Sequence, residues 1–142
     1  MIIMLIKKEN ITQFIPQREP FVMIDSLASA NENGFESAFK IEEDNIFLEQ
    51  NILSESAVVE NIAQTCAAGF GYINSLKGAG EGQLGFIGAV SRLTVESLPE
   101  NGATIETKIE ILSTFDTIHL VQGTAFSGDQ KLVECQMKIV LA

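Results

Sequence analysis

The sequence predicts an α+β fold in which one long helix packs against an antiparallel sheet. Two observations lead to this prediction. Residues 56–76 repeat apolar side chains at three- and four-residue steps over the length of a long helix. The segments on either side alternate apolar and polar residues over shorter runs that turn sequences separate. The chain has 142 residues and shows no internal repeat or linker, so we expect one domain over residues 1–142.

Ahead of the helix, the sequence predicts a strand, a helical turn and a hairpin. The apolar run at 1–6 is expected to be a strand. Residues 10–15 predict a helical turn that ends at the prolines 16 and 20. A strand at 21–24, a turn at 31–34 and an alternating strand at 35–41 then predict a β-hairpin. Residues 42–53 are expected to form a loop.

The helix and the strands after it have their own start and stop signals. Ser54 or Ser56 is expected to cap the helix, which should end before a glycine-rich, flexible connection at 78–82. Four strands are predicted after it, at 84–98, 105–111, 116–126 and 133–139. The turns between them are short, which favours an antiparallel meander.

Composition and charge exclude several classes of protein. The net charge of −10 argues against nucleic-acid binding, which needs a basic face. An acidic partner such as a carrier protein would need a local basic patch, for which the candidates are Lys7, Lys8, Arg18, Lys77 and Arg92. No run approaches the roughly 20 apolar residues that span a bilayer. The apolar N-terminus precedes its lysines and is short, unlike a secretory signal, so a cytoplasmic location is expected.

The cysteines are expected to be buried, reduced thiols. Cys66 falls in the helix and Cys135 in a predicted strand, without a CxxC pair. With a single histidine in the sequence, neither a metal site nor a cofactor is expected.

Glu60 is the strongest candidate for a chemical role. It is the one charged side chain from Ser56 to Leu76, and a helix without a charged face is usually buried on most sides. Burial should raise the pKa of a carboxyl group and suit it to acid–base chemistry near neutral pH. Gln64 lies one turn later on the same face, where it can hydrogen-bond Glu60 or a ligand carbonyl. The alternative is that Glu60 stabilises the helix start or pairs with a basic residue.

The single histidine is a weaker candidate. The neighbours of His119, Ile118 and Leu120, are apolar and should face the core. His119 is therefore expected on the opposite face of its strand, without a catalytic role.

Several motifs together resemble the 3-hydroxyacyl-[acyl carrier protein] dehydratases. The segment 15–25, IPQREPFVMID, resembles their N-terminal signature, and 60–64, ENIAQ, resembles the start of their central helix. Other residues fall near the glycine, proline and glutamate spacing of that family: Gly88, Pro99, Gly102, Gly123 and Glu134. The resemblance covers nearly the whole chain.

This resemblance implies a hotdog fold, in which a long central helix is wrapped by an antiparallel β-sheet. It also implies a dimer and an acyl tunnel along the helix at the subunit interface. In the family, the helix glutamate works with a histidine from the other subunit to dehydrate a 3-hydroxyacyl thioester. Glu60 matches that glutamate and Gln64 matches the glutamine one turn later, with Asn51 and Gly88 as further candidates for binding substrate.

The chain departs from the family at its histidines. The family histidine belongs to a glycine- and proline-rich segment before the helix, but residues 47–55 are shorter and have neither histidine nor proline. Asn51 or Gln50 lies nearest the missing group, and neither is a base near neutral pH. Gln17 also replaces a signature histidine. In this the chain more closely resembles the divergent dehydratases of aryl polyene and flexirubin-type pigment clusters.

Three functions are consistent with these patterns. The first is a dehydratase of fatty acid or polyketide biosynthesis in which Glu60 is acid and base, assisted by Glu49 or by a histidine of a partner. Its substrate would be an acyl thioester on acyl carrier protein or coenzyme A. The second is a non-catalytic acyl-binding subunit, or the partner in a hotdog heterodimer rather than a homodimer. The third is an acyl thioesterase.

Overall fold

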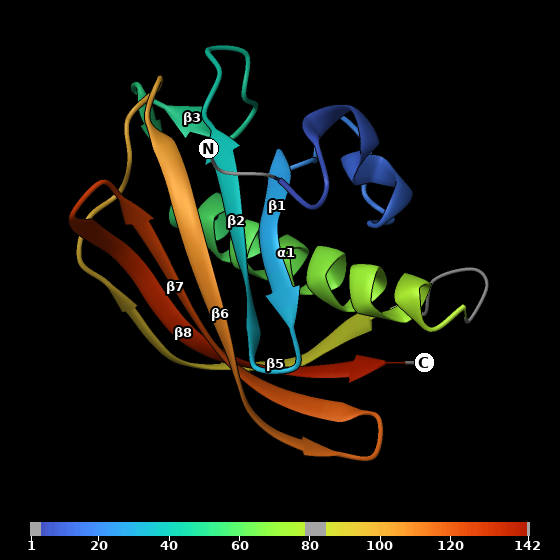
Figure 1. Ribbon diagram of the computed structural model, residues 1–142. Helices are drawn as coiled ribbons and strands as arrows, with labels where there is room; N and C mark the ends of the chain where they lie inside the picture. Colours follow the sequence, from blue (N-terminus) through green and yellow to red (C-terminus); the bar gives the residue numbers. More distant parts are fainter. Residues whose placement is uncertain (1–3, 79–84, 142) are drawn as a thin grey trace.

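The computed structural model describes residues 4–78 and 85–141. A long helix, α1 (Glu55–Leu76), lies against a curved antiparallel sheet that wraps around it (Figure 1). The sheet has the strand order β1-β2-β6-β7-β8-β5, and each of these strands contacts α1. Their bounds are Ser26–Asn31 (β1), Gly34–Lys40 (β2), Gly85–Val95 (β5), Thr104–Phe115 (β6), Ile118–Ser127 (β7) and Gln130–Leu141 (β8). The predicted α+β architecture is confirmed.

Helix α1 begins and ends close to the predicted residues. Ser54 is the N-cap, and its hydroxyl accepts a hydrogen bond from the backbone N–H of Ala57. Glu55 in the first turn suits the positive end of the helix dipole. The helix ends at Leu76, before the glycine-rich segment; of that segment, residues 79–82 lie outside the described residues.

The core lies between α1 and the sheet, and two glycines allow close approach there. A Cβ built on Gly123 of β7 would lie 2.3 Å from Cγ2 of Ile62 on the helix. A Cβ on Gly69 of α1 would lie 2.2 Å from Cγ of Phe35 on β2. Side chains at these two positions would force helix and sheet apart, because a packed interior has no room for the added carbon.

The first predicted strand is in the wrong place. Residues 21–24 are not a strand, and β1 begins at Ser26. The carbonyl of Phe21 and both backbone groups of Met23 bind side chains of the helix instead of a neighbouring strand. The predicted hairpin itself is confirmed, because β1 pairs antiparallel with β2 across the turn at 31–34. The predicted helical turn is a 3-10 helix, η1 (Lys8–Gln13).

Two other regions also differ from the predictions. The described part of the apolar N-terminal run makes only an isolated bridge between Ile6 and Leu27, and residues 1–3 lie outside the described residues. Inside the predicted loop at 42–53, β3 (Leu48–Glu49) and β4 (Ile52–Leu53) form a small hairpin.

The meander prediction is correct for β6, β7 and β8 only. Strand β5 pairs with β8 at the far side of the sheet, and residues 96–103 carry the chain from β5 across to β6, which pairs with β2. This crossing places β5 at an edge of the sheet, with β8 its one pairing strand among the described residues.

Every residue of the edge strand β5 is exposed. Five of its side chains are large and apolar: Phe86, Ile87, Val90, Leu93 and Val95. Phe86, for example, is 54% exposed. An exposed edge strand rich in apolar side chains presents both unpaired backbone groups and apolar area to another chain.

Candidate functional site

The carboxylate of Glu60 projects from the second turn of α1 and is half-buried. It faces a cavity of about 480 Å³ that runs along this side of the helix. The burial predicted from the uncharged helix is therefore only partial in the single chain. Glu60 can meet a ligand in the cavity while the helix fixes its position.

Gln64 holds the Glu60 carboxylate in place. Its Nε2 atom donates a hydrogen bond of 2.7 Å to Oε2 of Glu60 and another of 2.9 Å to the carbonyl oxygen of Phe21. Its Oε1 atom accepts from the backbone N–H of Met23 at 2.6 Å. Both amide hydrogens and the carbonyl of this fully buried side chain are thus engaged. The predicted hydrogen bond between Gln64 and Glu60 is present.

Asn61, the residue after Glu60, also fixes the N-terminal segment around Met23 to the helix. Its Nδ2 atom donates to the carbonyl oxygen of Met23 at 2.6 Å, and its Oδ1 accepts from the hydroxyl of Thr107 on β6 at 2.6 Å. Asn61 is completely buried, and buried amides need such partners. Asn61 was not among the predicted site residues; the signal that could have found it is a polar amide among the apolar residues of the helix.

The cavity beside Glu60 has walls from three parts of the chain. Small residues of α1, Ala63, Ala67 and Gly71, form its helix side. Strands β5 and β8 contribute mostly apolar side chains, and residues 12–18 close it from the N-terminal segment. The helix and the sheet therefore give this cavity mostly apolar walls beside a carboxylate, an arrangement that fits a hydrocarbon chain.

Among the polar residues of the N-terminal segment that line this cavity, Gln17 and Arg18 stand out. Gln17 has a buried Oε1 atom without a hydrogen-bond partner among the described residues. Arg18 donates from Nη1 to the carbonyl oxygens of Ile15, at 2.9 Å, and of Gln17, at 2.8 Å. Residues 17 and 18 were noted in the sequence only as a replaced histidine and a basic charge, and the structure places both beside Glu60.

The structure does not bring the other predicted site residues to this cavity. Asn51 is exposed at the turn between β3 and β4, and Glu49 is exposed on β3. Gly88 lies in the bulge of β5 between Ile87 and Ala89. None of the three belongs to the described lining of the Glu60 cavity. Ile87, the neighbour of Gly88, does line it.

The predicted orientation of His119 is wrong. Its ring packs against Phe70 of α1 with centroids 4.5 Å apart, so it lies on the helix side of the sheet, while Ile118 is exposed. Val121 and Ala125 are buried beneath the helix, and His119 lies on the same face of β7 because side chains alternate between the two faces of a strand. Burial lowers the pKa of His119. The ring lines a second cavity, of about 460 Å³, and not the Glu60 cavity.

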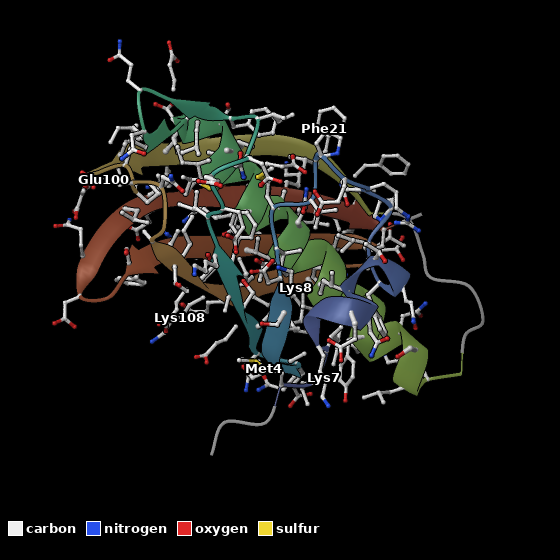
Figure 2. The ribbon with its side chains drawn as sticks, turned by 90° about the horizontal axis from the view of Figure 1, so that it is seen from above. Met4, Lys7, Lys8, Phe21, Glu100 and Lys108 are labelled. Atoms are coloured by element: carbon white, nitrogen blue, oxygen red, sulfur yellow. The ribbon has the colours of Figure 1, made fainter. Side chains whose placement is uncertain are left out.

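The basic side chains expected to meet an acidic partner lie in different places. Arg18 lines the Glu60 cavity, Lys77 lines the second cavity and Arg92 lies on β5. In Figure 2, Lys7 lies far from Phe21, whose carbonyl oxygen binds Gln64 beside Glu60. Lys8 lies 3.8 Å from the carboxylate of Asp25. The structure therefore leaves Arg18 as the predicted basic residue at the candidate site.

Both cysteines are free and buried, as predicted. Burial raises the pKa of the Cys66 thiol, and it raises that of Cys135 to about 11. Over residues 4–78 and 85–141, no cluster of three or more histidine, cysteine, aspartate or glutamate side chains has a geometry for holding a metal ion. In the same residues, no helix is long and apolar enough to span a bilayer.

The fold and sequence are similar to those of known dehydratases. A dehydratase heterocomplex, ApeI:P from Xenorhabdus doucetiae, superposes with a TM-score of 0.85 at 14% identity, over 93% of this chain and 90% of the other. A hypothetical thioesterase protein from Streptococcus pneumoniae TIGR4, solved as a mutant, superposes with a TM-score of 0.63 at 9% identity, over 82% of this chain and 88% of the other. The 3-hydroxyacyl-[acyl-carrier-protein] dehydratase FabZ of Clostridium kluyveri is 24% identical over 139 residues, 94% of each chain.

These likenesses define the class of the protein. A long helix wrapped by one antiparallel sheet is the hotdog fold, which the sequence resemblance had implied. The family model of the ApeP-like dehydratases, described as ApeP dehydratase, matches residues 9–141. The chain therefore belongs to the ApeP-like dehydratase family, a divergent branch of the hotdog dehydratases.

Proposed function

We propose that this protein dehydrates 3-hydroxyacyl thioesters, with Glu60 as the acid–base group. The observation that carries the proposal is a carboxylate, held by Gln64 at 2.7 Å, on the wall of a mostly apolar cavity. The cavity takes the acyl chain, and the carboxylate meets the carbons next to the thioester. The FabZ relative is named as a dehydratase of acyl-carrier-protein substrates, which supports a carrier-bound acyl group as substrate.

The reaction needs one proton to leave carbon and one to join oxygen. The Glu60 carboxylate removes a proton from the α-carbon of the 3-hydroxyacyl thioester, and the C–H electron pair forms the double bond between the α- and β-carbons. The β-hydroxyl group leaves with its bonding electrons, takes the proton from Glu60 and departs as water. The product is the 2-enoyl thioester, and Glu60 returns to its ionised form. Acid–base catalysis of this kind is typically worth about 100–10,000-fold in rate.

The neighbours of Glu60 have supporting roles in this proposal. Gln64 directs one carboxylate oxygen toward the helix and leaves the other for the substrate. Gln17 lines the same cavity, where its side-chain amide binds the substrate's hydroxyl group. Arg18, at the same cavity, attracts the negatively charged carrier.

We further propose that a second hotdog subunit pairs with β5. The lone histidine of the sequence, His119, lines the second cavity, so a histidine at Glu60 would have to come from another subunit. The exposed edge of β5 carries Phe86 and Ile87, which also line the Glu60 cavity. A subunit added at this edge would cover the apolar strand and close the cavity at once. The ApeI:P structure is described as a heterocomplex, which supports a partner of a different sequence.

The alternative is a subunit that binds acyl chains or completes a heterodimer without chemistry of its own. The absence of a histidine from the described lining of the Glu60 cavity favours it. A thioesterase is the third possibility, and the likeness to the Streptococcus pneumoniae protein concerns the fold alone.

Product analysis separates these functions. The purified chain, alone and mixed with a candidate hotdog partner, is incubated with 3-hydroxyacyl carrier proteins, and the products are identified by mass. An enoyl thioester, lighter than the substrate by the mass of one water molecule, supports the dehydratase. Free acid would show a thioesterase, and complex formation with product made only by the partner's own site would show a non-catalytic subunit.

Two variants assign the product to Glu60. Glu60→Gln should abolish enoyl formation, because an amide is neither a general acid nor a general base near neutral pH. Glu55→Gln is the matched control, since Glu55 lies on the same helix but is exposed in its first turn. Full activity in Glu60→Gln would remove Glu60 from the mechanism.

A further inference from the structure

The Glu60 cavity and the second cavity share two residues, Phe70 and Leu141. Phe70 lies on α1, and Leu141 lies on the helix side of β8. We call this pair the partition. On one side of it the channel leads back to Glu60, and on the other side lie Ile73, Asn74 and His119.

The Phe70 ring is fixed by aromatic neighbours on the sheet. It meets Phe35 of β2 edge-on, with centroids 5.0 Å apart, and it packs against His119 of β7 at 4.5 Å. Phe35 is itself buried. Aromatic contacts of this kind add stability beyond simple burial, so the ring has little freedom to turn aside for a ligand.

The two cavities are of similar size, about 480 and 460 Å³. Removal of the Phe70 ring would therefore roughly double the space open to a chain that enters beside Glu60. Phe70 follows Glu60 by ten residues, which is about 15 Å along a helix. An extended hydrocarbon advances roughly 1.3 Å per carbon, given C–C bonds of ~1.5 Å. An acyl group on the order of ten carbons would reach the partition.

We propose that Phe70 and Leu141 form a partition that limits the size of the acyl group. The partition separates the Glu60 cavity, which takes the acyl chain and is called the acyl cavity below, from the second cavity, which His119 lines. The proposal rests on the proposed acyl-thioester function and names the residues that set its substrate size. A chain too long for the acyl cavity would have to enter the second cavity. The Phe70 ring, held between Phe35 and His119, prevents this.

Four variants test the partition. Phe70→Ala and Leu141→Ala open it from the helix and from the sheet, so the second variant serves if the first does not fold. Ala67→Leu fills the acyl cavity itself, because Ala67 lines that cavity and is not in the described lining of the second one. Ile73→Ala is the matched control: it enlarges the second cavity from the same helix and leaves the partition intact.

The first readout is the affinity for 3-hydroxyacyl pantetheines of graded chain length, measured by calorimetry. For the unaltered protein, affinity should rise with chain length until the chain meets the partition and then stop rising. Phe70→Ala or Leu141→Ala should extend the rise, and two more buried methylenes correspond to about tenfold tighter binding. Ala67→Leu should shorten the longest chain bound, and Ile73→Ala should leave it unchanged.

The second readout uses His119 as a reporter. Because His119 is the one histidine of the sequence, its ring gives a unique NMR signal, and it lines only the second cavity of the two. Long acyl pantetheines should shift this signal in Phe70→Ala and leave it in place in the unaltered protein. The same comparison in Ile73→Ala should show no shift.

The outcomes separate this inference from the proposed function. An unchanged length profile in both partition variants, or a His119 signal that long chains already shift in the unaltered protein, would overturn the partition. A lack of acyl binding at any length would overturn the partition and the acyl cavity together. Binding with the expected length profile, but without enoyl product in the presence of a partner, would overturn only the dehydratase proposal.

Discussion

Replacement of Gln64 by leucine should destabilise the protein, because Gln64 connects the N-terminal segment, the helix and Glu60. The change removes three hydrogen bonds, to the Met23 N–H, the Phe21 carbonyl and the Glu60 carboxylate. The Met23 N–H is the costly loss. Met23 is 1% exposed, so water cannot replace the Gln64 oxygen, and an unpaired buried donor costs about 1–3 kcal/mol.

The other two groups should cost less. Phe21 is 55% exposed and Glu60 is half-buried, so both can turn to water, and together they should contribute about 1 kcal/mol. The expected loss in the free energy of unfolding is therefore about 2–4 kcal/mol in total. In a chain of this size, that lowers Tm by roughly 5–15 °C. Urea denaturation followed by circular dichroism, together with calorimetry, measures both quantities.

The control for this prediction is Glu60→Gln. It keeps an oxygen that can accept from Gln64, so its free energy of unfolding should stay within about 1 kcal/mol of the unaltered protein. Gln64→Leu should also lower turnover, but by less than Glu60→Gln, because it releases the carboxylate without removing it. Equal stability of Gln64→Leu and the unaltered protein would refute the role of this hydrogen-bond network.

Three further predictions concern other parts of the fold. Burial lowers the pKa of His119, so its contribution to stability should be complete above pH ~6.5 and be lost as pH falls below that value. His119→Phe should abolish this pH dependence of the urea midpoint, measured on both sides of pH ~6.5. An identical pH profile in the variant and the unaltered protein would contradict this. Cys66 and Cys135 should resist a thiol reagent in the folded protein and both react in urea, because they are buried with raised pKa values; rapid labelling of the native protein would contradict this. Gly69→Ala should destabilise the protein by about 1–3 kcal/mol in the same denaturation assay, since its Cβ would press on the buried Phe35 ring, and an unchanged or raised midpoint would show that the ring can move.

The parts of the fold that follow from local patterns could be predicted from the sequence. The period of the apolar stripe located α1, and the serines before it limited the N-cap to Ser54 or Ser56, of which the structure has Ser54. The turn at 31–34 located the first hairpin. The i, i+4 spacing also placed Gln64 beside Glu60, because these positions are neighbours on any α-helix.

The parts that depend on distant contacts could not be predicted. The segment at 21–24 looks like a strand, and only the amides of Asn61 and Gln64, about forty residues later on the helix, explain why it is not one. The face of His119 was ambiguous because Leu120 and Val121 are both apolar, and the packing of α1 onto Val121 decides it. The pairing of β5 with β8 is likewise set by the sheet as a whole and not by the turn that follows β5.

The most direct test of the account is whether Glu60 transfers the α-proton. The protein, together with a candidate hotdog partner, is equilibrated in heavy water with a 3-hydroxyacyl or 2-enoyl thioester, and deuterium at the α-carbon is measured by mass spectrometry. We predict that the unaltered protein and Glu55→Gln incorporate deuterium there and that Glu60→Gln does not. Incorporation by Glu60→Gln at the unaltered rate would contradict the proposed role of this carboxylate.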